Sequence, residues 1–231
     1  MGVGFLVGIG HAFEADHVSA VSTQIVKQNA FAKNSIKSCF AKSSILGAIW
    51  GAGHTTALVL FGFATYLLTV TFTPEFFLGF EFLVGAMLVF LGLSAIINKK
   101  IQFKHTHPHK HSDGRIHFDA HSHGKEEHTH NHKSYIIGLI HGLAGSGTLV
   151  MLTAGTFDSV ETILAFVGVF GLGSVVGMIL ISGILGLPLI FSHKISNFKK
   201  ILRYAAGGFS IILGVNILFE VGLVRLLGSW L

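Results

Sequence analysis

Four ionisable side chains near the start of the chain have the types and spacing to bind a metal ion: His11, Glu14, Asp16 and His17. They lie within an otherwise apolar stretch. A charged side chain at the centre of a membrane-spanning helix costs about 2.5 to 3.5 kcal/mol on insertion scales, and such residues usually mark an ion or substrate path. Imidazole with carboxylate, without thiolate, suits borderline divalent ions such as Ni²⁺, Co²⁺ or Zn²⁺. The stretch therefore predicts a metal site.

Two further histidines are expected at the same depth. His11 lies about ten residues into its apolar stretch, about 15 Å at 1.5 Å per residue, which is the middle of a core about 30 Å thick. His54 reaches a similar depth from the opposite side, and His141 reaches it in a later stretch. The predicted metal-binding set is therefore His11, Glu14, Asp16, His17, His54 and His141.

The spacing of the first four residues restricts how they can meet one ion. On a straight helix His11, Glu14 and His17 span an arc of about 120°, but Asp16 falls about 140° from His11. Either the helix bends near Gly10, where Gly8 and Gly10 would permit unwinding, or only some of the residues bind. In the second case His11, Asp16 and His17 would bind while Glu14 orients a ligand imidazole.

The composition predicts an all-α integral membrane protein. The chain has 231 residues, 51% of them hydrophobic, only 12% charged, and a mean hydropathy of +0.67. Cys39 is the single cysteine, which excludes a disulfide framework within the chain. The net charge of +5 comes from residues in short loops and not from a separate basic domain, so no nucleic-acid partner is expected. The expected surroundings are a lipid bilayer.

Six apolar stretches are long enough to cross the membrane as helices. They run over residues 1–24, 43–69, 76–98, 135–156, 160–191 and 202–223. Fifteen of the 16 lysines and arginines lie on one side, in the loops or, for Arg203, at the start of the last span, and the positive-inside rule makes that side cytoplasmic. The predicted location is the cell membrane, multi-pass, with both termini outside; Glu81 and Glu220 are expected near the outer ends of their spans, in contact with solvent.

The two halves of the chain resemble each other. The segment ending at His11 matches the one ending at His141, Gly53-His54 matches Gly173-Ser174, and Gly85 and Gly92 match Gly207 and Gly214. Because each unit has three spans, the second copy would be inverted, an architecture in which transporters bind substrate between the repeats. We predict a first repeat over residues 1–98 and a second over 135–231.

Residues 99–134 form a third region, rich in histidine. Ten histidines lie between His105 and His132 among charged and small residues, so the segment cannot form a packed core and is predicted to be a disordered cytoplasmic loop. Its composition favours weak, multivalent capture of metal ions. Metallochaperones or accessory proteins of a metalloenzyme are plausible partners for such a loop.

The motifs resemble those of a known family. The sequence His11-Ala12-Phe13-Glu14-Ala15-Asp16-His17 is similar to the H-A-x-D-A-D-H signature of the nickel/cobalt transporter family in the NicO superfamily, with Glu14 where that family usually has Asp. Gly53-His54-Thr55 resembles its G-H-[ST] motif, and the segment from Gly138 to Gly145 its H-G-L-A-G segment. The resemblance implies a permease for Ni²⁺ or Co²⁺, in either the uptake or the efflux direction.

Two other functions compete with this interpretation. His11 and Asp16 also fit the H-x4-D spacing of acyltransferases, and a bound metal could activate water, so the alternative is an intramembrane metal-dependent hydrolase or acyltransferase. A metal sensor or metal-delivery protein would use the histidine-rich loop. We expect a permease and not an enzyme, with no prosthetic group, because the metal ion is its substrate; the sequence has no nucleotide-binding P-loop.

Overall fold

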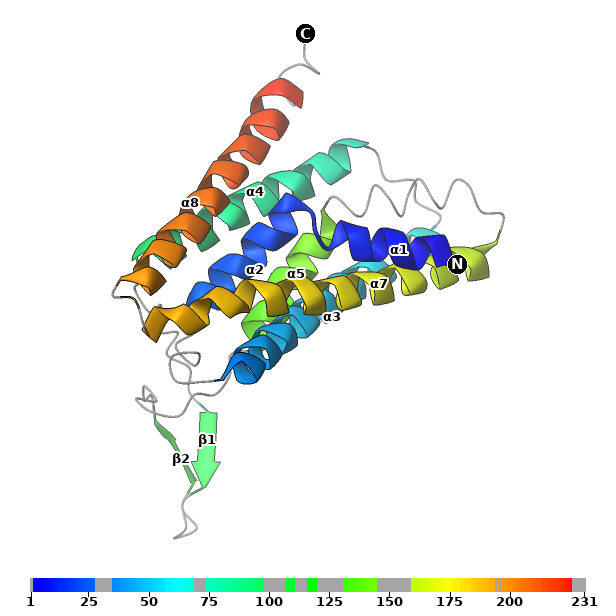
Figure 1. The fold of residues 1–231 in the computed structure, drawn as a ribbon. Helices are drawn as coiled ribbons and strands as arrows, with labels where there is room; N and C mark the ends of the chain where they lie inside the picture. The colour runs from blue at the N-terminus through cyan, green and yellow to red at the C-terminus, as the bar shows by residue number, and fades with distance from the viewer. Residues whose placement is uncertain are drawn as a thin grey trace.

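Helices form nearly all of the structure that is described (Figure 1). The computed structural model describes residues 2–27, 35–68, 74–97, 107–110, 116–119, 131–144, 159–193, 195 and 197–225. The helices are α1 (Gly2–His11), α2 (Ala15–Lys27), α3 (Ile36–Leu68), α4 (Pro74–Ile97), α5 (Asn131–Leu143), α7 (Val160–Gly186) and α8 (Phe198–Phe219). A 3₁₀ helix, η1 (Leu187–His193), follows α7, and a π-helical segment, η2 (Glu220–Arg225), follows α8.

Four of these helical segments are long and apolar enough to cross a membrane. They are Ile36–Ala64, Phe76–Ile97, Glu161–Phe191 and Phe198–Gly222. Large apolar side chains such as Leu6, Leu93 and Ile212 are exposed on the outside of the bundle, as lipid-facing residues are. The predicted helical membrane protein is confirmed at this level. Of the predicted fourth span, α5 covers the part before Ala144, and residues 145–156 lie outside the described residues.

The first predicted span is not one helix through residue 24. The helix ends at His11 and resumes at Ala15, so α1 and α2 meet at a break over Ala12–Glu14 (Figure 1). The predicted bend is confirmed, but its glycine explanation is wrong. Gly10 lies inside α1 in open space, and Gly8 is needed for packing because a Cβ there would collide with the backbone of α7 at Phe170.

Two pairs of helices pack with their backbones in contact, because the residues at the contact positions are glycines without a Cβ. Gly8 of α1 abuts the Phe170 carbonyl of α7, and Gly173 of α7 abuts the Phe5 carbonyl of α1. In the same way Gly53 of α3 abuts Tyr135 of α5, and Gly138 of α5 abuts Trp50 of α3. Contact positions further apart along the helices give the direction, because they rise together from Gly4–Phe166 to Ile9–Gly177 and from Leu46–Ser134 to Ala57–Gly142. Helix α1 therefore runs parallel to α7, and α3 runs parallel to α5.

Two other pairs are antiparallel. Gly85 and Gly92 of α4 contact Gly214 and Gly207 of α8, respectively. Between α3 and α7, Gly51 packs on Val175 and Gly171 packs on Thr55, whose hydroxyl donates a hydrogen bond of 3.1 Å to the Gly171 carbonyl. The bundle thus places α3 and α7 at its centre, with α4 and α8 against α2 on one side (Figure 1).

The fifth predicted span changes its helical form near its end. The α-helix gives way to η1 at Leu187. Pro188 follows immediately, and a proline lacks the amide donor that would continue the α-helical hydrogen bonds. The tightened turn is a local consequence of that proline.

Two short strands lie within the histidine-rich region, where the sequence analysis predicts a disordered loop. Strand β1 (His107–Lys110) pairs antiparallel with β2 (Ile116–Asp119), with His109 opposite His117. Ile116 and Phe118 are residue types that favour strands, although a two-stranded hairpin is marginal alone. The loop also ends earlier than predicted, because α5 begins at Asn131; residues 98–106, 111–115 and 120–130 lie outside the described residues.

Candidate metal centre

The break between α1 and α2 carries the signature residues. His11 is the last residue of α1, Glu14 lies in the turn, and Asp16 and His17 are in the first turn of α2. The turn satisfies its own amides: Ala12 N–H donates to the Gly8 carbonyl at 3.3 Å, Phe13 to Gly10 at 3.0 Å, and Glu14 to His11 at 3.1 Å. Because unpaired backbone groups are costly at membrane depth, these bonds allow a break there.

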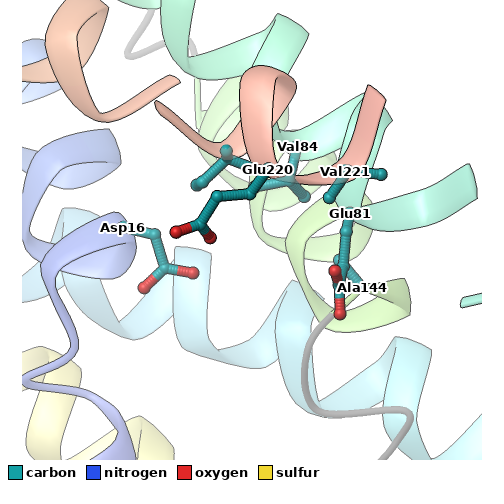
Figure 2. Close-up of a pocket in the computed structure, with 7 residues that line it drawn as sticks. Asp16, Glu81, Val84, Ala144, Glu220 and Val221 are labelled. Atoms are coloured by element: carbon teal, nitrogen blue, oxygen red, sulfur yellow. The ribbon is translucent and has the colours of Figure 1, made fainter. Parts of the chain in front are cut away.

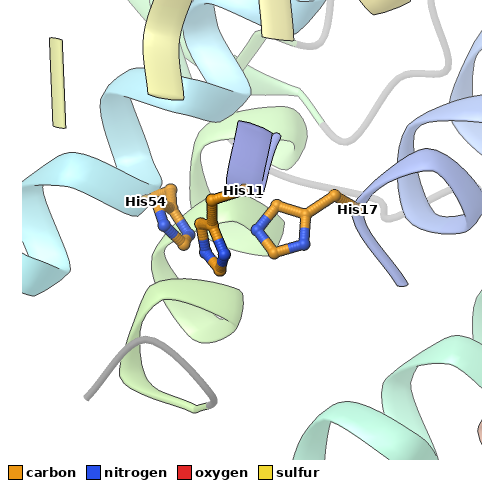
Figure 3. A group of neighbouring side chains, drawn as sticks. All are labelled: His11, His17 and His54. Atoms are coloured by element: carbon orange, nitrogen blue, oxygen red, sulfur yellow. The ribbon is translucent and has the colours of Figure 1, made fainter. Parts of the chain in front are cut away.

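Three imidazoles meet at this break from three different helices (Figure 3). His11 comes from α1, His17 from α2 and His54 from α3. Their ring centroids lie 4.5 Å apart for His11 and His17, 5.4 Å for His11 and His54, and 5.2 Å for His17 and His54. One potential ligand nitrogen from each ring lies within 4.8 Å of the other two, and all three residues are buried.

Carboxylates fix the orientation of two of these rings. The Glu14 carboxylate lies 2.7 Å from His11 Nδ1, and Asp16 Oδ1 lies 2.8 Å from His17 Nδ1. Since an ionised carboxylate only accepts, each Nδ1 donates the hydrogen bond and each Nε2 keeps its lone pair. Asp16 Oδ1 also accepts the His17 backbone N–H at 2.8 Å. The pairs leave His11 Nε2 and His17 Nε2 as ligand atoms.

The same nitrogens have no hydrogen-bond partner within the described structure. Both ring nitrogens of His54 are unpaired, as are His11 Nε2 and His17 Nε2. His54 is fully buried, and His17 is 2% exposed. Buried polar atoms are normally hydrogen-bonded, and an unsatisfied group in a folded protein calls for a specific explanation such as a missing ion. A divalent cation bound by the three imidazoles would supply the missing partner.

His141 joins the cluster through Asp16. His141 Nε2 lies 2.8 Å from Asp16 Oδ2, so the carboxylate bridges two imidazoles, His17 and His141, with its two oxygens. Asp16, His17 and His141 form a second set whose potential ligand atoms lie within 4.8 Å. His141 is 2% exposed, and its Nδ1 has no partner among the described residues. The α5 helix thus contributes to the site as predicted from its depth.

The structure brings all six predicted residues into one cluster, although their binding of metal stays a prediction. Five surround the break closely, whereas the Glu14 side chain is 55% exposed and reaches the cluster through His11. Sequence reasoning left the Asp16 carboxylate open as a direct ligand. In the structure both of its oxygens are already hydrogen-bonded to imidazoles.

Sequence reasoning missed Trp50. Its fully buried ring stacks on His54 with centroids 5.4 Å apart and planes 12° apart, and it lies 5.0 Å from His17 and 5.2 Å from His141. The signal was present in the spacing, because Trp50 and His54 are four residues apart and share one face of a helix. The indole covers one side of the imidazoles, and its buried Nε1–H has no partner among the described residues.

Comparison with known proteins gives a relative that matches nearly the whole chain. No protein-family model and no solved structure matches the chain. The urease accessory protein UreH of Bacillus sp. (strain TB-90) is 34% identical over 223 residues, which cover 96% of this chain and 92% of that protein. The aligned length includes both halves of the chain and every residue of the histidine cluster. The chain therefore belongs to the family of the urease accessory protein UreH.

Proposed function

We propose that this protein is a membrane permease for a divalent transition-metal cation, with Ni²⁺ or Co²⁺ as its cargo. One observation carries the proposal: three buried imidazoles from three helices converge with unpaired nitrogens inside an apolar helical bundle. Nitrogen ligands suit these ions. The name of the relative, a urease accessory protein, supports a nickel-related role, and it favours transport over the alternative of an intramembrane hydrolase or acyltransferase.

The cargo would be held by His11, His17 and His54. In this arrangement Glu14 and Asp16 would not contact the ion. Each accepts a hydrogen bond from the Nδ1 of a ligand imidazole, which fixes the tautomer of that imidazole and raises the basicity of its Nε2. An ion–nitrogen distance of about 2.1 Å puts neighbouring ligand nitrogens about 3.0 Å apart in the square-planar or tetragonal geometry of Ni²⁺. The ligand atoms lie within 4.8 Å of one another in the structure, so the rings would have to close around the ion.

The helix contacts support an inverted repeat of three plus three spans. An offset of 120 residues relates Gly51 to Gly171 and Thr55 to Val175. The Gly51–Val175 contact and the Gly171–Thr55 contact are therefore equivalent in the two halves of the chain. An offset of 122 residues relates Gly85 to Gly207 and Gly92 to Gly214. The Gly85–Gly214 contact and the Gly92–Gly207 contact are therefore equivalent in the same sense. Parallel packing of α1 with α7 and of α3 with α5 is what six alternating crossings require. A site between such repeats suits alternating access.

The proposed orientation has both termini outside and the histidine-rich loop in the cytoplasm, as the distribution of lysine and arginine predicts. The loop would then capture metal ions on the cytoplasmic side. This role is compatible with delivery to, or supply from, cytoplasmic accessory proteins.

Metal flux into vesicles tests the proposal. The full-length protein is reconstituted in liposomes that contain a metal-quenched dye, and entry of Ni²⁺ and Co²⁺ is followed for the native protein, His54→Ala and His132→Ala. His132 is the matched control, because it is an exposed histidine on α5. We expect His54→Ala to abolish flux and His132→Ala to keep it. Equal flux through all three proteins, or none through the native protein, would refute the metal-permease assignment.

A further inference from the structure

A cavity of about 180 Å³ adjoins the metal centre on the side of α4 and α8 (Figure 2). Its lining residues are Asp16, Glu81, Val84, Ala144, Ile217, Glu220 and Val221. Three of the seven are carboxylates, and the other four are apolar. The sequence places Glu81 and Glu220 near span ends in contact with solvent. In the structure Glu220 is exposed and Glu81 is half-buried, and both also line the cavity that Asp16 lines.

The packing of α4 on α8 brings the two glutamates together. Glu81 lies four residues before Gly85, so it is on the α4 face that contacts α8 through Gly214. Glu220 begins the π-helical segment η2 directly after α8, and single π turns often occur at functional sites. The Glu220 carboxylate points towards Asp16 (Figure 2). These carboxylates come from three different elements and face one space.

A second observation links the cavity to the metal centre. Asp16 forms both a wall of this cavity and the bridge between His17 and His141. Each of those histidines is 2% exposed and keeps one nitrogen unpaired within the described part of the chain, His17 Nε2 and His141 Nδ1. The cavity is therefore separated from buried, unsatisfied imidazoles by a single carboxylate.

We propose that this cavity is a cation vestibule, in which Glu81 and Glu220 hold a hydrated divalent cation beside Asp16 before it passes to the imidazoles. The inference rests on the proposed metal transport and adds a second binding site to it. A water needs about 10 to 15 Å³ of such space, so the cavity holds a cation with much of its water shell. Carboxylate oxygens suit an ion that retains water, and the imidazoles suit one that has lost it.

The glutamates act by charge. A cleft of one sign with low-dielectric walls raises the local concentration of counter-ions and their rate of entry by about 10 to 1,000-fold, and salt weakens the effect. The vestibule thus sets how readily dilute metal ions reach the site. It leaves the transfer step itself to Asp16 and the histidines.

Flux measurements with Glu81→Gln, Glu220→Gln and the double variant test the vestibule, because glutamine keeps the size of the side chain and removes its charge. Glu161→Gln is the matched control, an exposed glutamate in the first turn of α7. Initial rates of Ni²⁺ entry are measured over a range of Ni²⁺ and of ionic strength. We expect the KM of the double variant to rise on the order of tenfold, with kcat kept and with a weaker dependence on salt.

The outcomes separate this inference from the proposed function. If the native protein transports Ni²⁺, His54→Ala does not, and the double variant keeps the KM and salt dependence of Glu161→Gln, the vestibule is wrong and the permease stands. If the double variant loses kcat with KM unchanged while it elutes as the native protein does on size exclusion, the glutamates act in transfer and the vestibule is again refuted. No flux through the native protein refutes the permease itself.

Discussion

Two groups of histidines in this chain differ in number and in placement. Of the 15 histidines, ten lie between His105 and His132, and four lie in the buried cluster, one each on α1, α2, α3 and α5. The four clustered rings have centroids as close as 4.5 Å, and carboxylates bind three of them. The other ten lie close in sequence, on the segment that includes β1, β2 and the start of α5.

The comparison shows what position adds to residue type. In the cluster, the hydrogen bonds of Glu14 and Asp16 decide which nitrogen of His11 and His17 faces the site, and burial removes competing water. A ligand that is already oriented by a hydrogen bond and by burial loses little entropy on binding. The four clustered imidazoles should therefore control transport, and the ten histidines of the histidine-rich region should control only how much metal is held nearby.

The largest effect should come from His17→Ala, because His17 belongs to both sets of potential ligands. We expect Ni²⁺ binding at the cluster and Ni²⁺ flux to disappear, measured by calorimetry on the purified protein and by vesicle flux. The exposed His132→Ala is the control. Retention of tight binding by His17→Ala would show that the loop, and not the cluster, provides the main site.

Asp16→Asn should have the next largest effect. The substitution keeps the shape but removes the charge, and one amide cannot accept from both His17 and His141 as the two carboxylate oxygens do. Loss of such an orienting group typically lowers metal affinity about 10 to 100-fold. Ni²⁺ titrations of the variant give the affinity directly. A native affinity would mean that burial alone orients the imidazoles.

Glu14→Gln should have a smaller effect than Asp16→Asn. The Glu14 side chain is 55% exposed and binds one imidazole, and the glutamine carbonyl can still accept the bond from His11 Nδ1. We expect the affinity for Ni²⁺ to fall by less than the roughly tenfold lower bound typical of lost orienting groups. A loss as large as that of Asp16→Asn would instead place the Glu14 charge on the metal.

Deletion of residues 105–132 should change transport least. The initial rate of Ni²⁺ flux in vesicles should stay near that of the native protein, while the amount of Ni²⁺ bound per chain at high metal concentration falls. Both quantities are measured on the same preparation. If flux disappears while the deleted protein keeps its thermal stability, the loop is part of the transport path and the contrast between the two groups fails.

Much of the fold could be predicted because long apolar stretches leave a chain few alternatives to membrane helices. The bend in the first span also followed from the sequence, since a straight helix cannot direct His11 and Asp16 to one place. Its location at Ala12–Glu14 could not be predicted, because it depends on the turn's own hydrogen bonds and on where Gly8 locks against α7. The β1–β2 hairpin was not predicted, because the histidines and the charged and small residues around it are typical of a disordered segment.

The residues of the candidate site were predictable by type and depth, but their pairing was not. Nothing in the spacing shows that Asp16 bridges His17 and His141, because His141 is 125 positions away. The cavity shared by Asp16, Glu81 and Glu220 likewise depends on how α4 and α8 pack beside α2. Local sequence indicates which side chains can do chemistry, and the tertiary contacts decide which partner each one has.

The position of Trp50 gives the protein an optical reporter of its own site. The chain has only two tryptophans, Trp50 and Trp230, and the Trp50 indole lies within 5.4 Å of the rings of His17, His54 and His141. Open-shell ions such as Ni²⁺ and Co²⁺ quench the emission of a nearby indole, whereas Zn²⁺ does not. In a Trp230→Phe background the remaining fluorescence would therefore report occupancy of the cluster, separately from metal held by the histidine-rich loop.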